Sequence, residues 1–171
     1  VRGVLSVRVG LNRLTLLQWG TEEQGQRWLV PQAKGEKLAT FGLTEPGVGT
    51  DAGALQPSAR RHGDSYVLNG HKAVVTGAPF ATHIFVTART SGAQRDAAGV
   101  TVFLVPKNAK GVSTRDYPTV DGLRASEIYF ENVSVDASAV VGEVDNGMPL
   151  IEKVVDEAIA AVCAEAIGCF K

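Results

Sequence analysis

The hydrophobic period of this chain changes from that of strands to that of a helix close to residue 142, and this change constrains its fold more than any other feature. From residue 38 to residue 141, short apolar segments alternate with turn residues, at the spacing typical of an all-β barrel or sandwich. From residue 149 to residue 170, apolar residues recur every three or four positions, which is the period of an α-helix. The sequence therefore predicts a β region of about six or seven strands followed by one long amphipathic helix.

The first 37 residues predict helices. Residues 1–20 are rich in leucine without a strict period, and Thr21 followed by Gln24 is the pattern of a capping box. We expect a short helix to begin there and to end at Pro31.

Within the β region, turn residues divide the apolar segments. The Asn69-Gly70 pair lies between two such segments and predicts a hairpin, because both residues tolerate a positive φ. A second turn is predicted at residues 62–64. Residues 100–105 are apolar on both faces, which predicts a central strand, and a phase shift between Phe130 and Val133 predicts either a bulge or a strand that changes partners.

The predicted final helix carries a longer apolar stripe than the rest of the chain can cover. We expect Asn146 to cap it and Pro149 to lie in its first turn. Its stripe is expected to pack on other segments or on another subunit. Cys163 and Cys169 lie six positions apart on this helix, so they point in different directions and are predicted to be free thiols.

Composition excludes several classes of partner. The 171 residues include 44% hydrophobic residues, enough for a substantial core, and 17 Lys+Arg balance 18 Asp+Glu without a long run of either sign. We therefore expect no nucleic-acid partner and no membrane partner. The sequence contains neither a signal-peptide pattern nor an apolar run of membrane length, so we expect a soluble, cytoplasmic protein.

Residues 41–51, Phe-Gly-Leu-Thr-Glu-Pro-Gly-Val-Gly-Thr-Asp, form an apolar strand that runs into a glycine-rich turn. Gly47 and Gly49 would let a ligand approach the backbone, and Thr44 and Thr50 offer hydroxyls on either side. These residues alone fit a ligand cradle and an ordinary loop exit equally well.

Other known site patterns are missing. A dinucleotide fingerprint would need glycine where Ala52 stands, and no Gly-Lys-Ser/Thr phosphate loop occurs. His62, His71 and His83 lack a second ligand at metal spacing, so we expect them in turns or on strand surfaces and predict no metal site.

Several motifs in consistent order carry a family resemblance. They are FGLTEPGVGTDAGAL, YVLNGHKAVVTG, TVFLVP and GVS followed by DGLRASEIYFENVSV. From about Gly20 to Gly168 the chain resembles the acyl-CoA dehydrogenases. This implies a mainly β, α+β fold, with a middle β-barrel domain between helical segments. Residues 1–37 would end an N-terminal helical domain, residues 38–144 would form the flavin-binding barrel, and residues 145–171 would begin a C-terminal helical domain.

The resemblance also implies an activity. Such an enzyme oxidises an acyl-CoA thioester in fatty acid metabolism: a carboxylate base removes the α proton, and the β hydrogen leaves as hydride to N5 of FAD. The implied partners are the acyl-CoA substrate, an electron-transfer flavoprotein or a similar acceptor, and further subunits of a homotetramer or hetero-oligomer. The implied location is the cytoplasm, or the mitochondrial matrix in a eukaryote.

The site residues that the resemblance implies are Phe41, Leu43, Thr44, Gly49, Thr50, Val74 and Thr76. Thr44 would donate a hydrogen bond to the pyrimidine end of the flavin, and the hydroxyl or amide of Thr76 would meet N5. Gly49 and Thr50 would contact the diphosphate, with Thr50 also near the substrate. Val74 stands where the family usually has a tryptophan that covers the ring.

No catalytic base is assigned. In most members of the family it lies in a later segment. In a minority it is a glutamate directly followed by an arginine, and this pair aligns here with Ala158 and Ile159. Glu157 is interpreted as a solvated residue. We therefore expect the chain to be part of a longer subunit, to bind FAD weakly and to be inactive by itself. Two alternatives stay open: a flavin-dependent oxidase or monooxygenase of the same fold, and a non-catalytic subunit or structural fragment.

Overall fold

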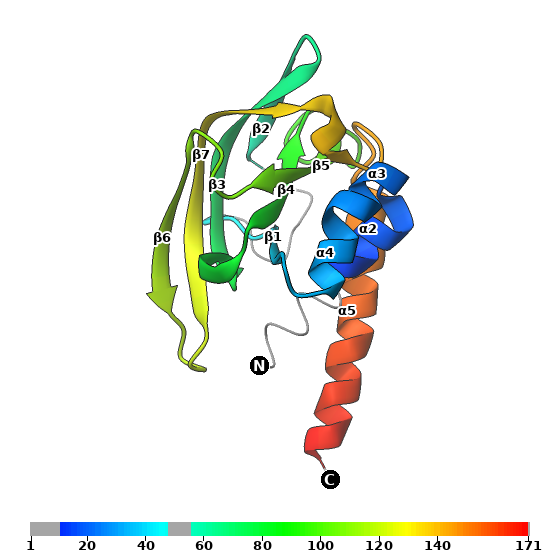
Figure 1. Ribbon diagram of the computed structural model, residues 1–171, viewed down its shortest axis with the longest axis vertical. Coiled ribbons are helices and arrows are strands. Elements are labelled where there is room, and N and C mark those ends of the chain that lie inside the picture. The colour runs from blue at the N-terminus through cyan, green and yellow to red at the C-terminus, as the bar shows by residue number, and fades with distance from the viewer. Residues whose placement is uncertain (1–10, 48–55, 171) are drawn as a thin grey trace.

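The computed structural model describes residues 11–47 and 56–170, and Figure 1 shows a twisted sheet flanked by helices on one side. The helical elements are α2 (Arg13–Trp19), α3 (Glu22–Gln24), the π-helical turn η2 (Gly25–Leu29), α4 (Val30–Ala33) and the long α5 (Met148–Cys169). Short 3-10 turns occur at η3 (Ala78–Phe80) and η4 (Ala137–Ala139).

Eight strands form one sheet in the described part of the chain. They are β1 (Ala39–Gly42), β2 (Ser58–His62), β3 (Ser65–Thr76), β4 (His83–Arg89), β5 (Val100–Pro106), β6 (Val112–Pro118), β7 (Arg124–Asp136) and β8 (Val140–Val141). The order is β6-β7-β3-β2-β4-β5-β8, and β1 pairs with β4 beside this path. The mainly β class with flanking helices is confirmed, but the predicted barrel is wrong in one respect: the sheet is not closed.

The capping box at the start of α3 is confirmed. Thr21 Oγ1 accepts from the Gln24 amide at 3.2 Å, and Gln24 Oε1 accepts from the Thr21 amide at 3.1 Å. Pro31 does not end this helix, contrary to the prediction, because α4 continues the helical backbone of η2 through Pro31 to Ala33. The Arg27 carbonyl, four residues before it, accepts from Lys37 Nζ at 2.9 Å instead.

The predicted hairpin at Asn69-Gly70 is wrong, since β3 runs without interruption through both residues. Asn69 forms hydrogen bonds with Asn132 on β7: its Oδ1 accepts from the Asn132 amide at 2.8 Å. Asn132 has φ +51°, and the register shifts here, so the predicted bulge between Phe130 and Val133 is confirmed. The turn predicted at residues 62–64 does join β2 to β3.

Gly70 is required by a close neighbour rather than by a turn. A Cβ placed on it would lie 2.5 Å from the Pro57 Cβ. We therefore expect Gly70→Ala to lower the free energy of unfolding by about 1–3 kcal/mol in urea denaturation. Gly25→Ala is the control, because its Cβ would meet nothing within 4 Å and its helical position favours alanine. Equal stability of the two variants would contradict the Pro57 contact.

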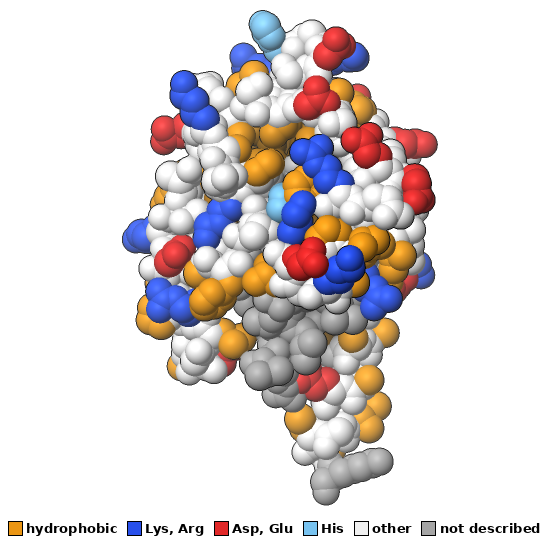
Figure 2. All heavy atoms as spheres, viewed as in Figure 1, with side chains coloured by type: hydrophobic (Ala, Val, Ile, Leu, Met, Phe, Trp, Pro, Cys, Tyr) orange, Lys and Arg blue, Asp and Glu red, His pale blue; other side chains and the backbone are white. Residues whose placement is uncertain are grey.

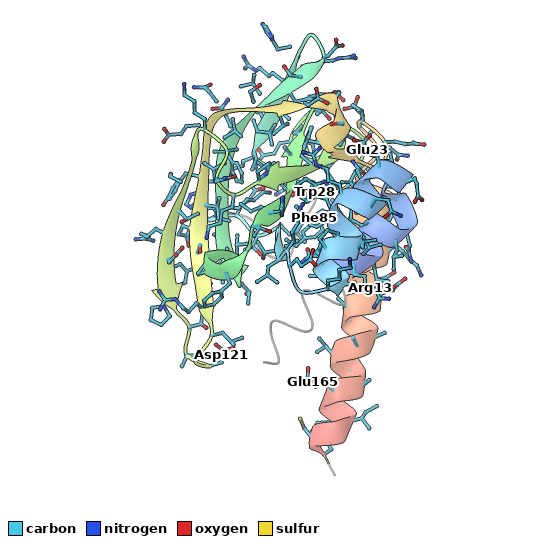
Figure 3. All side chains as sticks on the ribbon, viewed as in Figure 1. Arg13, Glu23, Trp28, Phe85, Asp121 and Glu165 are labelled. Atoms are coloured by element: carbon cyan, nitrogen blue, oxygen red, sulfur yellow. The ribbon has the colours of Figure 1, made fainter. Side chains whose placement is uncertain are left out.

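Two hydrophobic clusters pack against opposite sides of the sheet. One lies among the strands and includes Phe103 and Ile128. The other fills the space between β1, β4 and β5 and the helices, and includes Leu16, Phe85 and Leu150. Figure 3 shows Phe85 in this layer, with Trp28 beside it. Both faces of β5 are buried, which confirms the central strand predicted at residues 100–105.

The long helix α5 confirms the predicted change of period. Its N-cap is Gly147 rather than Asn146, whose side chain donates to Glu143, and Pro149 lies in the first turn as predicted. The first half is buried against the body, whereas the second half extends beyond it and exposes apolar side chains (Figures 1 and 2). Cys163 and Cys169 form no disulfide, as predicted. Of the helices that the structure describes, none is long and apolar enough to cross a membrane.

Candidate functional site

A hollow of about 420 Å³ lies between β1, β3 and the first two-thirds of α5, from Ile151 to Cys163. We call it the β1/α5 hollow. Its walls are Leu11, Thr40, Phe41, Leu43, Thr44, Val74, Thr76, Ile151, Val154, Val155, Ala158, Ile159, Val162 and Cys163. Five of the seven predicted site residues therefore share one cavity, and the other two, Gly49 and Thr50, lie outside the described residues.

The strands β1 and β3 reach this hollow together because they are bound to each other. Thr40 Oγ1 donates to the Thr76 carbonyl at 2.8 Å, and the Ala73 amide donates to the Thr44 carbonyl at 2.8 Å. The parallel pairing of β1 with β4 fixes the other side of β1. The hydroxyl-bearing residues Thr44, two positions after β1, and Thr76, at the end of β3, thus reach the same hollow.

Val74 is strained at this wall. It has φ +51°, which a β-branched residue rarely adopts, and the register of β3 with β7 shifts between Lys72 and Val75. Its side chain is 54% exposed. Strain of this kind persists where the surrounding structure enforces it, and it is common at functional sites. The bulge thus directs Val74 into the hollow.

The opposite wall comes from α5 and is apolar. Ala158 and Ile159, the positions that align with the Glu-Arg pair, both line the hollow. Glu157, one position earlier, accepts from Gln18 Nε2 at 3.2 Å and lies 3.4 Å from Lys153. Its contacts are those of a helix-surface residue. Among the described residues of the hollow, none carries a carboxylate.

An ion pair lies buried next to Leu43, one of the wall residues of the hollow. Lys72 Nζ lies 2.6 Å from Glu45 Oε1 and donates to Thr87 Oγ1 at 2.9 Å, and both charged side chains are almost fully buried. Burial lowers the pKa of Lys72 from 10.5 to about 8, and the neighbouring Glu45 carboxylate offsets only part of that effect. Sequence reasoning missed this pair, although a lysine among the inward positions of an apolar strand was a usable signal.

His83 is a second buried titratable group, and here the predicted surface position is wrong. Its ring centroid lies 3.8 Å from that of Trp28, and Thr82 Oγ1 lies 2.7 Å from its Nδ1. Burial, then the positive charges of Lys37 and Arg27, lower its pKa to about 4. The ring is therefore neutral near pH 7 and packs as part of the helix–sheet interface.

No group of three His, Cys, Asp or Glu residues that could hold a metal ion occurs in residues 11–47 and 56–170.

A second hollow, of about 430 Å³, lies between β2 and the loop that follows β4. Its polar wall includes Arg60, Arg89 and Gln94. Arg89 directs its guanidinium to carbonyl groups of that loop, including those of Ala98 and Asp96 at 3.0 and 3.1 Å. These bonds hold the loop in place and contact none of the predicted site residues.

Comparison of the sequence and the structure with known proteins identifies the family of the chain. Residues 40–133, more than half of the chain, match the family model described as acyl-CoA dehydrogenase, middle domain. The chain belongs to the acyl-CoA dehydrogenase family. The matched segment runs from within β1 to within β7 and includes the strand wall of the β1/α5 hollow.

Individual relatives extend beyond that segment. The chain is 40% identical over 152 residues to a 3-(aryl)acrylate reductase of Clostridium sporogenes, covering 87% of this chain and 40% of the reductase. It is 37% identical over 171 residues to the short-chain-specific acyl-CoA dehydrogenase of Clostridium acetobutylicum, covering 96% and 44%. The structure of butyryl-CoA dehydrogenase from Megasphaera elsdenii superimposes with a TM-score of 0.90 at 32% identity, covering 96% and 44%. The chain thus spans less than half the length of each of these relatives.

The acyl-CoA dehydrogenase family implies FAD, and the described residues of the hollow suit a flavin ring. A flat, largely apolar ring system needs apolar walls, which Phe41, Leu43 and the α5 side chains provide. Its polar edge needs a few placed donors, and neither the Thr44 nor the Thr76 hydroxyl forms a hydrogen bond with another described residue. The donor set and the wall chemistry therefore fit the cofactor.

Proposed function

We propose that this chain is the flavin-holding part of an FAD-dependent acyl-CoA dehydrogenase. The observation that carries the proposal is the meeting of Phe41, Leu43, Thr44, Val74 and Thr76 in the β1/α5 hollow. Bound FAD would supply the hydride acceptor for α,β-dehydrogenation of an acyl-CoA thioester. The substrate's α proton would go to a carboxylate base outside the described residues of the hollow.

The chain's own residues would bind and orient the ring. Thr44 would donate a hydrogen bond to the pyrimidine end of the ring, where negative charge gathers on reduction, and such a bond is worth roughly 1–3 kcal/mol. The hydroxyl or amide of Thr76 would meet N5. Phe41, Leu43 and the α5 wall would exclude water from the apolar part. Gly49 and Thr50 are proposed to contact the diphosphate, with Thr50 also near the substrate.

The relatives support the substrate class. One is a short-chain-specific acyl-CoA dehydrogenase, and another is a reductase of 3-(aryl)acrylates, whose double bond is the kind that α,β-dehydrogenation forms. We propose an electron-transfer flavoprotein or a similar acceptor as the partner, and a homotetramer or hetero-oligomer as the assembly. The apolar side chains exposed on the second half of α5 support an association surface there.

The two hydroxyls give the first test. Replacing Thr44 and Thr76 together by valine keeps the side-chain shape and removes both donors, so the dissociation constant for FAD should rise about tenfold or more. Titration of flavin fluorescence against the purified chain measures this. Thr114→Val, on the exposed strand β6, is the control and should leave the constant unchanged. A double variant that binds FAD as tightly as the parent would refute the assignment of these hydroxyls.

A flavin-dependent oxidase or monooxygenase is the second candidate, favoured by one observation. Val74 is half-exposed in the hollow, where a tryptophan would cover the ring, so oxygen would have easier access. The two reactions differ in their electron acceptor. Exposing the substrate-treated full-length enzyme to air should release peroxide slowly if it is a dehydrogenase, and rapid release would favour the oxidase.

A further inference from the structure

The buried Glu45–Lys72 pair joins the two segments that carry the candidate flavin-edge residues. Glu45 directly follows Thr44, and Lys72 precedes the bulge that presents Val74. Glu45 is therefore one residue from the wall residue Thr44 of the β1/α5 hollow, and Lys72 is two residues from the wall residue Val74.

Every polar atom of the pair is directed to a specific partner. Besides Glu45 and Thr87, Lys72 Nζ lies 3.4 Å from the Leu43 carbonyl. The second carboxylate oxygen of Glu45 accepts from the Gln56 amide at 2.9 Å. One carboxylate thus connects the end of β1, the middle of β3 and the approach to β2.

The backbone is shaped to admit the lysine. A Cβ on Gly42 would lie 3.3 Å from Lys72 Cγ, so a side chain there would displace the lysine stem. The amide of Ala73, the residue after Lys72, donates to the Thr44 carbonyl at 2.8 Å. Side-chain and backbone contacts therefore fix the same register between β1 and β3.

A buried ion pair is a poor way to gain stability, because well-packed apolar residues of similar size are often as stable. What it provides is a single allowed arrangement of the segments it joins. We propose that Glu45 and Lys72 are a positioning pair, which sets Thr44 and Val74 at the β1/α5 hollow and so determines how tightly that hollow binds a flavin. This inference rests on the proposed flavin-holding function.

The test is a chain carrying both Glu45→Leu and Lys72→Met, which removes both charges and leaves none unpaired. FAD titration should show a dissociation constant raised by about tenfold or more, although unfolding in urea stays cooperative. Thr101→Val is the control. Thr101 is fully buried and bonds Thr90 and Asp145 elsewhere on the sheet, so its loss should leave FAD affinity within about twofold.

A folded double variant that binds FAD like the parent would overturn the proposal. If the double variant fails to fold, Glu45→Asp replaces it, because it keeps both charges and withdraws the carboxylate by one methylene. That variant should bind FAD several-fold more weakly, and unchanged affinity would again overturn the positioning role.

A third measurement separates this inference from the proposed function. If the parent chain binds no flavin, the proposed function fails, and hydrogen exchange at the Ala73 amide then decides the positioning role. In the double variant, or in Glu45→Asp if the double variant does not fold, exchange at Ala73 should be about tenfold faster than in the parent, with protection in β5 unchanged. Equal protection at Ala73 in parent and variant would overturn the positioning role.

Discussion

A chain in which leucine replaces Glu45 while Lys72 remains is expected to lose about 3–5 kcal/mol of unfolding free energy. The lysine ammonium is fully buried, and its remaining partners, Thr87 and the Leu43 carbonyl, are neutral. The cost of desolvating the Lys72 ammonium would then no longer be compensated by a carboxylate. Urea unfolding followed by circular dichroism measures the loss.

Adding Lys72→Met to Glu45→Leu should restore most of that stability, to within about 1 kcal/mol of the parent. The double-mutant cycle then isolates the coupling between the two side chains. If Glu45→Leu alone proves nearly as stable as the parent, the pair is solvated and the buried arrangement is contradicted.

The same pair predicts a pH dependence. The pKa of Lys72 is lowered by burial from 10.5 to about 8, so between these values the unfolded chain binds more protons than the folded one. Stability contributed at this position should therefore rise as the pH increases from about 8 to 10.5. The difference in unfolding free energy between the parent and the double variant removes the contribution of other groups. If this difference does not change between pH 8 and 10.5, the lowered pKa of Lys72 is contradicted.

Phe85→Ala is expected to cost about 3–5 kcal/mol. The ring is fully buried on β4, in the layer between sheet and helices where Figure 3 labels it, and it stacks on Phe41 with ring centroids 5.7 Å apart. Removing it leaves a cavity behind a wall of the β1/α5 hollow. We therefore expect FAD affinity to fall as well, because Phe41 would lose its support.

Phe80→Ala is the matched control for this prediction, since the Phe80 ring is 56% exposed. It should change the free energy of unfolding by less than about 1 kcal/mol. Thermal unfolding of the two variants beside the parent gives the comparison. A Phe85 variant no less stable than the Phe80 variant would contradict the packing of the helix–sheet layer.

The sequence predicted the features that depend on residues a few positions apart. The helical stripe of α5 and the capping box at Thr21 were predicted from residue spacing, because the helical period and a cap bond relate residues three or four positions apart. The hairpin at Asn69-Gly70 was wrong because distant partners override the turn preference of these residues. Asn69 bonds Asn132, and Gly70 makes room for Pro57.

The candidate site could be predicted only in part. Spacing alone left residues 41–51 equally compatible with a ligand cradle and a loop exit, and the family motifs supplied the candidate residues. Neither source indicated the Glu45–Lys72 pair or the positive φ of Val74. Both depend on contacts between strands: Glu45 and Lys72 lie 27 positions apart, and the bulge at Val74 arises from its pairing with β7.

The most direct test of the central claim is to map where FAD binds. Titrating the isotope-labelled chain with FAD and following backbone amide resonances should shift Thr44, Thr76 and Ala158, which line the β1/α5 hollow from three elements. The Thr44→Val and Thr76→Val double variant should need a higher FAD concentration for the same shifts. Shifts confined to the second hollow, around Arg60 and Gln94, or no shifts at all, would contradict the account.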